Sequence, residues 1–126
     1  MILSIGTDIV EVYRIAETMT RTPRFAKRVF TEYERNYCDN KGAAAAQSYA
    51  GRFAAKEAFL KALQTGWRRK ITWQDVEIVS DSQGVPSFRI KGEAEKLLSD
   101  LGANRIHLSI SHTTEHAVAQ VILEKA

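Results

Sequence analysis

The segment from residue 51 to residue 63 constrains the fold of this chain more than any other. Together with the alanine run before it, this segment predicts one helix that begins near Ala43 and ends at Gly66, where glycine favours a left-handed helix end. On a wheel of about 3.6 residues per turn, apolar side chains cover almost the whole circumference, which is typical of a buried helix. Glu57 and Lys61 then lie within an apolar stripe, where a carboxylate needs a compensating cation or metal. The helix alone favours a simpler interpretation, an ordinary Glu–Lys contact one turn apart worth about 0.2–0.5 kcal/mol.

The rest of the chain carries strand and helix patterns in turn. The expected elements are a strand at 2–10, a helix around 12–19, helices that start after Pro23 and at the capping box Thr31–Glu34, a hairpin of 76–79 with 87–90, a helix around 94–101 and a hairpin of 106–112 with 117–123. A chain of 126 residues with these elements predicts one compact domain, residues 1–126. We expect the α+β class, with antiparallel hairpins and the N-terminal strand packed on the long central helix.

The first strand carries a candidate site residue. Because side chains alternate along a strand, Asp8 lies on the same face as Gly6, where the missing side chain leaves room for a ligand or another backbone. The alternative for Asp8 is a helix cap or turn carboxylate, which is the commoner role for an aspartate in this position.

Composition limits the compartment and the partners. The single cysteine, Cys38, excludes an intrachain disulfide and a cysteine zinc cluster, and a reducing cytoplasm is therefore expected. The first residues lack a basic leader, and their apolar run is too short for a signal peptide or a membrane span. The net charge of +3 weakly indicates an anionic partner. A chain of this length is short for an enzyme whose active site lies within one subunit, so an oligomer is plausible.

A basic surface follows the first strand. Helical spacing places Arg14 and Arg21 on the outer side of the first expected helix, and Arg24 and Arg28 continue this surface around Phe25. An aromatic side chain among arginines resembles a protein-docking patch. A solvated charged helix with Phe25 turned into the core is the competing interpretation.

The usual catalytic motifs are absent. The chain has no Walker loop, no nucleophile elbow and no zinc-protease motif, and its three histidines lack a metal-ligand spacing. What remains is a pair of carboxylates, Asp8 and Glu57, accompanied by Lys61 and a basic loop that starts at Trp67. Two carboxylates with open positions for water and phosphate suit Mg²⁺. This combination indicates phosphate chemistry.

Three segments in this order resemble one enzyme family, the small 4′-phosphopantetheinyl transferases represented by holo-acyl-carrier-protein synthase. They are Ile5-Gly6-Thr7-Asp8-Ile9-Val10, Gly51-Arg52-Phe53-Ala54-Ala55-Lys56-Glu57-Ala58 and Ser109-Ile110-Ser111-His112-Thr113. The resemblance runs from the first strand to the last and matches the expected chain length.

The resemblance implies a reaction and a set of residues. It implies that 4′-phosphopantetheine passes from coenzyme A to a serine of apo-acyl carrier protein, with release of adenosine 3′,5′-bisphosphate, in support of fatty acid biosynthesis. Asp8 and Glu57 are implied to hold Mg²⁺ against the pyrophosphate, with Lys61 near the same phosphates, and these three are the expected catalytic residues. The general base stays open between a metal-bound water and Glu57. The residues implied to bind coenzyme A are Arg52, Lys56, Lys61, Ser111, His112 and Thr113.

The resemblance also gives the basic surface a partner. Arg14, Arg21, Arg24, Phe25 and Arg28 match positions that dock the acidic acyl carrier protein. A homotrimer with active sites at subunit boundaries is implied as well. The chain departs from the family after Leu63, where a glycine-rich turn is replaced by Gln64-Thr65-Gly66-Trp67-Arg68, a bulkier and more basic loop. This departure affects contacts to the nucleotide end of coenzyme A, so the loop is left out of the expected site.

Two other functions remain open. One is a different Mg²⁺-dependent enzyme, such as a nucleotide phosphohydrolase. The other is a basic binding module for nucleic acid or acidic proteins, with Asp8 and Glu57 purely structural. Nucleic acid is not expected, because the basic residues are not interleaved with exposed aromatic residues in a recognition pattern.

Overall fold

The computed structural model describes residues 1–64 and 70–126 as a single compact α+β domain, and it confirms the expected class. Its elements are β1 (Ile2–Glu11), α1 (Val12–Arg21), α2 (Arg24–Val29), α3 (Glu32–Asp39), the 3₁₀ turn η1 (Gly42–Ala44), α4 (Ala45–Leu63), the 3₁₀ turn η2 (Trp73–Asp75), β2 (Val76–Ser80), β3 (Pro86–Ile90), α5 (Gly92–Leu101), β4 (Arg105–His112) and β5 (His116–Glu124).

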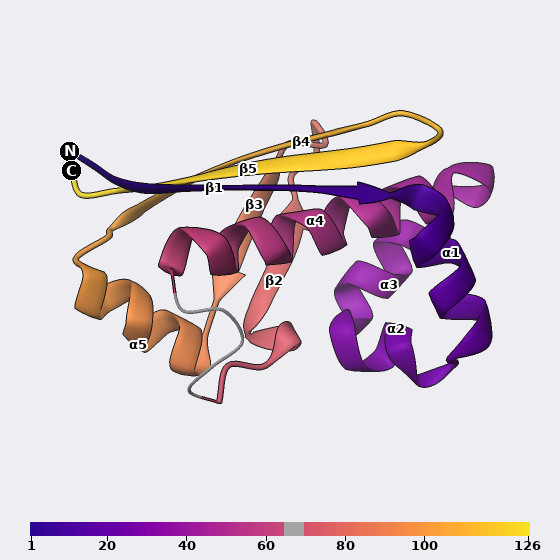
Figure 1. The fold of residues 1–126 in the computed structure, drawn as a ribbon, viewed down its shortest axis with the longest axis horizontal. Coiled ribbons are helices and arrows are strands. Elements are labelled where there is room, and N and C mark those ends of the chain that lie inside the picture. The colour runs from indigo at the N-terminus through magenta and orange to yellow at the C-terminus, as the bar shows by residue number, and fades with distance from the viewer. Residues whose placement is uncertain (65–69) are drawn as a thin grey trace.

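Two antiparallel sheets pack around α4 (Figure 1). The larger sheet has the order β1-β5-β4, so the N-terminal strand pairs with the last strand of the C-terminal hairpin. The other sheet is the predicted hairpin of β2 and β3. Helices α1, α2 and α3 gather at one end of α4, and α5 lies toward the other end.

The central helix is shorter than expected. A 3₁₀ turn covers Gly42–Ala44, and α4 itself begins at Ala45 and ends at Leu63. The left-handed position at its end is taken by Gln64, with φ of 65°. The expected end at Gly66 is therefore wrong for the helix, and Gly66 and the basic loop through Arg69 lie outside the described residues.

The contact between β1 and α4 explains Gly6. A Cβ atom added there would overlap the carbonyl oxygen of Ala58, so the strand and helix backbones touch at this point. Ser4 Oγ also donates to the carbonyl oxygen of Ala62 at 2.6 Å. The room left by the missing side chain is filled by another backbone, which was one of the two expected uses. This close approach fixes where the next residue on the same face, Asp8, meets the helix.

Candidate functional site

Asp8 and Lys61 meet across the contact between β1 and α4. Lys61 Nζ lies 3.0 Å from Asp8 Oδ1 and donates a second hydrogen bond to the carbonyl oxygen of Thr7 at 3.1 Å. The Asp8 side chain is 17% exposed and the Lys61 side chain is 56% exposed. Both groups are therefore accessible to a ligand, while the backbone around them is held by the core.

Glu57 lies one helical turn before Lys61 on α4, and it is half-buried. Residues four apart share a helix face, so the carboxylate of Glu57 and the ammonium group of Lys61 project to the same side. Within residues 1–64 and 70–126, no cluster of three or more histidine, cysteine, aspartate or glutamate side chains could enclose a metal. A cation at Asp8 and Glu57 would therefore take its other ligands from water and substrate oxygens, which is how Mg²⁺ is commonly bound.

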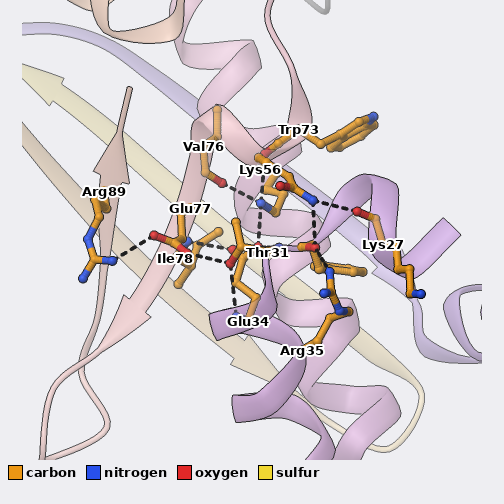
Figure 2. Close-up of polar contacts among 12 residues, drawn as sticks. Lys27, Thr31, Glu34, Arg35, Lys56, Trp73, Val76, Glu77, Ile78 and Arg89 are labelled. Carbon is orange, nitrogen blue, oxygen red and sulfur yellow. Dashed lines mark hydrogen bonds and ion pairs between the residues drawn. The ribbon is translucent and has the colours of Figure 1, made fainter. Parts of the chain in front are cut away.

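The buried charges of α4 are not the expected ones. Lys56 is fully buried, and its Nζ lies 2.9 Å from Glu34 Oε1 and donates to the carbonyl oxygens of Trp73 at 3.0 Å and Val76 at 2.6 Å (Figure 2). Burial lowers the pKa of Lys56, and the charge of Glu34 opposes this shift.

These contacts correct the expectation that Lys56 binds coenzyme A. All three of its N–H bonds point to protein acceptors, and no part of the side chain reaches solvent.

Arg52 provides a second cationic group on α4, one helical turn before Lys56. The residue is only 7% exposed, and its Nη2 donates to Ser80 Oγ at 2.9 Å. Its guanidinium carbon lies 4.1 Å from the ring centroid of Tyr37, and Lys41 Nζ lies 4.5 Å from the same centroid. Burial raises the pKa of Tyr37. Hydrogen bonds to Ser80 and Lys41 and the charge of Arg52 lower it by more than burial raises it, so the pKa is below its ordinary value.

Sequence reasoning missed Tyr37 and Lys41. Their spacing of four residues is a visible helical signal, but α3 ends at Asp39 and the approach of Arg52 comes from a separate helix. Lys41 and Arg52 lie against the same Tyr37 ring because α3 packs beside α4, and local spacing carries no signal of that contact.

The segment from Ser111 to Thr113 lies away from Asp8 and Lys61 in a single chain. His112 ends β4, and its Nδ1 is 3.0 Å from Oε1 of Gln47 near the start of α4. The Cα atoms of Gln47 and Lys61 lie about 21 Å apart along the helix axis, at 1.5 Å per residue. In addition, β1 and β4 form opposite edges of the sheet, with β5 between them.

The three side chains of this segment also differ in their contacts. All three residues are exposed, and Thr113 Oγ1 also accepts hydrogen bonds from the backbone N–H groups of Glu115 at 3.2 Å and His116 at 3.1 Å. The expected convergence of this segment on the Glu57–Lys61 pair is therefore not formed within one chain.

The basic surface is present on α1 and α2. Arg14 Nε lies 2.9 Å from Glu11 Oε1, and Arg21 Nη2 lies 2.8 Å from Glu17 Oε1, in well-exposed ion pairs. Arg24 and Arg28 are exposed on α2.

Phe25 is instead half-buried among aromatic rings. Its ring centroid lies 6.2 Å from that of Phe30 and 6.0 Å from that of Phe53. For this one side chain the structure supports the core interpretation, with only part of the ring left on the surface. Among the described residues, no helix combines the length and apolar character needed to cross a membrane.

Comparison with known proteins gives one consistent family. The model of the 4′-phosphopantetheinyl transferase superfamily matches residues 4–121. The chain is 48% identical over 125 residues to a holo-[acyl-carrier-protein] synthase of Koribacter versatilis, covering 98% of this chain and 99% of the relative. It is 46% identical over 126 residues to a protein of the same name from Geobacter metallireducens, covering 99% of both chains.

Solved structures agree with this result. A holo-(acyl-carrier-protein) synthase from Bacillus anthracis, in complex with CoA (3′,5′-ADP), is 40% identical with a TM-score of 0.82, covering 100% of this chain and 99% of that one. A synthase from Helicobacter pylori in complex with coenzyme A is 30% identical with a TM-score of 0.82, covering 95% and 99%.

Proposed function

The chain belongs to the 4′-phosphopantetheinyl transferase superfamily, and we propose that it is a holo-acyl-carrier-protein synthase. The reaction moves 4′-phosphopantetheine from coenzyme A to a serine hydroxyl of an apo-acyl carrier protein and releases adenosine 3′,5′-bisphosphate. The observation that carries the proposal is the meeting of Asp8 and Lys61 one turn from Glu57, in a chain similar along its whole length to a synthase solved with CoA. The role is proposed to lie in fatty acid biosynthesis in the cytoplasm.

Asp8 and Glu57 are proposed to hold Mg²⁺. The donor set fits this ion, because two partly accessible carboxylates leave room for water and phosphate oxygens. When bound, Mg²⁺ neutralises the negative charge of the pyrophosphate. Lys61 is held by Asp8 and the carbonyl oxygen of Thr7, and its ammonium group can donate to a phosphate oxygen at the same place.

The remaining step needs alignment more than a protein nucleophile. The serine oxygen of the carrier forms a bond to the β-phosphorus of coenzyme A while the bond from that phosphorus to the bridging oxygen breaks, and the bridging oxygen leaves with the nucleotide. Phosphoryl transfer of this kind depends mainly on positioning and on compensation of negative charge. Lys61 supplies positive charge, and Glu57 is a candidate to accept the serine proton.

Coenzyme A is proposed to contact Arg52, Ser111, His112 and Thr113 in addition to Lys61. Since Asp8 and the Ser111–Thr113 segment lie at opposite edges of one sheet, these contacts are proposed to come from different subunits. The uncovered face of the sheet supports this arrangement. Ile5 and Ile9 are 61% and 66% exposed there, on the side of β1 opposite Gly6, and a second copy of the chain would cover them. We propose a homotrimer with sites at the subunit boundaries.

The exposed arginines of α1 and α2 are proposed to dock the acidic carrier protein, with the accessible part of Phe25 adding apolar contact. The set is Arg14, Arg21, Arg24, Phe25 and Arg28. Complementary charge between this surface and the carrier would mainly raise the association rate and fix the orientation of the carrier.

The test is direct. The protein is incubated with apo-acyl carrier protein, coenzyme A and Mg²⁺, and the carrier is weighed by intact-protein mass spectrometry. We expect the mass of one phosphopantetheine group to be added to the carrier, and no addition when a chelator replaces Mg²⁺. A carrier that stays unmodified in the complete mixture with Mg²⁺ would refute the proposal.

The same reaction mixture distinguishes the alternatives. A phosphohydrolase would release nucleotide from coenzyme A in the absence of carrier. A nucleic-acid module would bind DNA or RNA with a steep dependence on salt and would leave the carrier unmodified.

A further inference from the structure

Lys56 and Glu34 join three parts of the fold at one buried point (Figure 2). Glu34 is fully buried on α3, and its carboxylate accepts the backbone N–H groups of Thr31 at 2.8 Å and Ile78 at 2.7 Å, beside the ammonium group of Lys56. Lys56 also holds the carbonyl oxygens of Trp73 and Val76. The pair therefore ties α4 to the start of α3 and to the segment that leads into β2.

Apolar residues are spread around α4, so its rotation depends on a few specific contacts, one of which is the close approach of Gly6 on β1 to the Ala58 backbone. Helices with one apolar stripe are oriented by the hydrophobic effect, but α4 is buried on nearly every side. Its packing surface combines the large buried side chains of Phe59, Leu60 and Leu63 with small alanines, namely Ala50, Ala54, Ala55, Ala58 and Ala62. Rotating the helix about its axis would bring other apolar residues to each side, so hydrophobic burial alone distinguishes these rotations weakly.

A buried charge changes this balance. An ammonium group without partners is very costly in an apolar interior, so only a rotation that points Lys56 at Glu34 and the two carbonyl oxygens is acceptable. In some proteins a buried polar or ionic group selects one packing arrangement among several of similar hydrophobic energy. The next residue along the helix is Glu57, and its direction is set by the same rotation.

We propose that Lys56 and Glu34 are a positioning pair that fixes the rotation of α4 and so aims Glu57 toward Asp8. The inference rests on the proposed function. Both side chains are completely buried, so neither touches substrate, and the pair acts only through the helix. The position of Glu57 matters because displacing a catalytic group by about 1 Å can lower the reaction rate by about 10²-fold.

Two single variants test the pair, one on α4 and one on α3. Lys56→Met removes the charge and the donors at similar length, while Glu34 keeps its two backbone hydrogen bonds. Glu34→Gln changes α3 and leaves α4 untouched. For each folded variant we expect kcat to fall about 10-fold to 10²-fold and the half-saturating Mg²⁺ concentration to rise, with the KM for coenzyme A and for the carrier nearly unchanged.

Arg89→Met is the matched control. It removes the ion pair between Arg89 and Glu77, 3.1 Å long, from the same network on β2 and β3 without touching α4. We expect a lower melting temperature at most, with normal kcat and normal Mg²⁺ dependence. Variants of Lys56 and Glu34 that behave like this control would show a purely structural role and overturn the inference.

A crystal structure of the Lys56→Met protein provides a readout that does not depend on turnover. We expect the Glu57 carboxylate to be displaced relative to Asp8. An unchanged α4 with Glu57 in place would also overturn the inference. Wild-type protein without transferase activity would refute the proposed function instead, and the crystallographic comparison would still test the positioning pair. If Lys56→Met does not fold, Glu34→Gln is crystallised and judged by the same criterion.

Discussion

The charged residues of α4 divide between two tasks according to their burial. Lys56 is completely enclosed and has three protein acceptors, so it serves the packing of the helix. Lys61, one turn and one residue further along, keeps more than half of its side chain in solvent while holding Asp8. The same residue type thus serves the core at one position and the site at the other.

A substitution of Glu57 tests the site at the scale of one residue. Glu57→Gln removes the negative charge at almost constant volume, and we expect kcat to fall by about 10²-fold or more, because charge compensation at the transferred phosphoryl group is lost. Circular dichroism and thermal unfolding should stay close to wild type, because Glu57 is only half-buried. The measurement is the initial rate of carrier modification over a series of Mg²⁺ concentrations.

Glu95→Gln is the control for this variant, since it makes the same chemical change at an exposed position of α5. We expect no change in rate from it. Full activity of Glu57→Gln across the whole Mg²⁺ series would contradict the assignment of Glu57 as a metal ligand.

At the scale of elements, local signals predicted most of the structure. The capping box of Thr31 and Glu34 is present, and both hairpins have antiparallel registers. The second role of Glu34 could not be predicted, because its partners Lys56 and Ile78 are far away in sequence. The helical wheel predicted a buried α4, but it did not show that Lys56 would be the enclosed charge while Lys61 stays exposed.

The two basic helices allow a prediction about the partner. Arg14→Ala on α1 should raise the KM for the carrier protein several-fold while leaving the KM for coenzyme A unchanged, because Arg14 is well exposed and its ion pair with Glu11 lies at the surface. The effect should shrink as the ionic strength rises, since salt screens exposed charges. Steady-state kinetics with each substrate varied in turn measures both constants.

Lys96→Ala provides the comparison, because it removes an exposed cation from α5, away from the basic surface of α1 and α2. It should leave both KM values unchanged. An Arg14→Ala protein with weakened coenzyme A binding and normal use of the carrier would contradict the docking assignment.

At the scale of the whole molecule, one chain holds parts of the site at opposite edges of a sheet. Asp8 lies on β1, and His112 ends β4, with β5 between these strands. Sequence reasoning could match both segments to the family, but not their separation, because strand order depends on contacts between distant parts of the chain. The exposed isoleucines at positions 5 and 9 lie on the uncovered face of the same sheet.

This separation leads to a test of shared sites. Asp8→Ala and His112→Ala should each abolish most of the transfer when the proteins are pure. If every site takes Asp8 from one subunit and His112 from its neighbour, mixed trimers formed by co-expression should recover activity. Random mixing in equal amounts gives intact sites at about a quarter of the boundaries in a closed symmetric ring. If each site were formed within one chain, no subunit of the mixture would hold both residues, and the mixture would stay as inactive as the two pure variants.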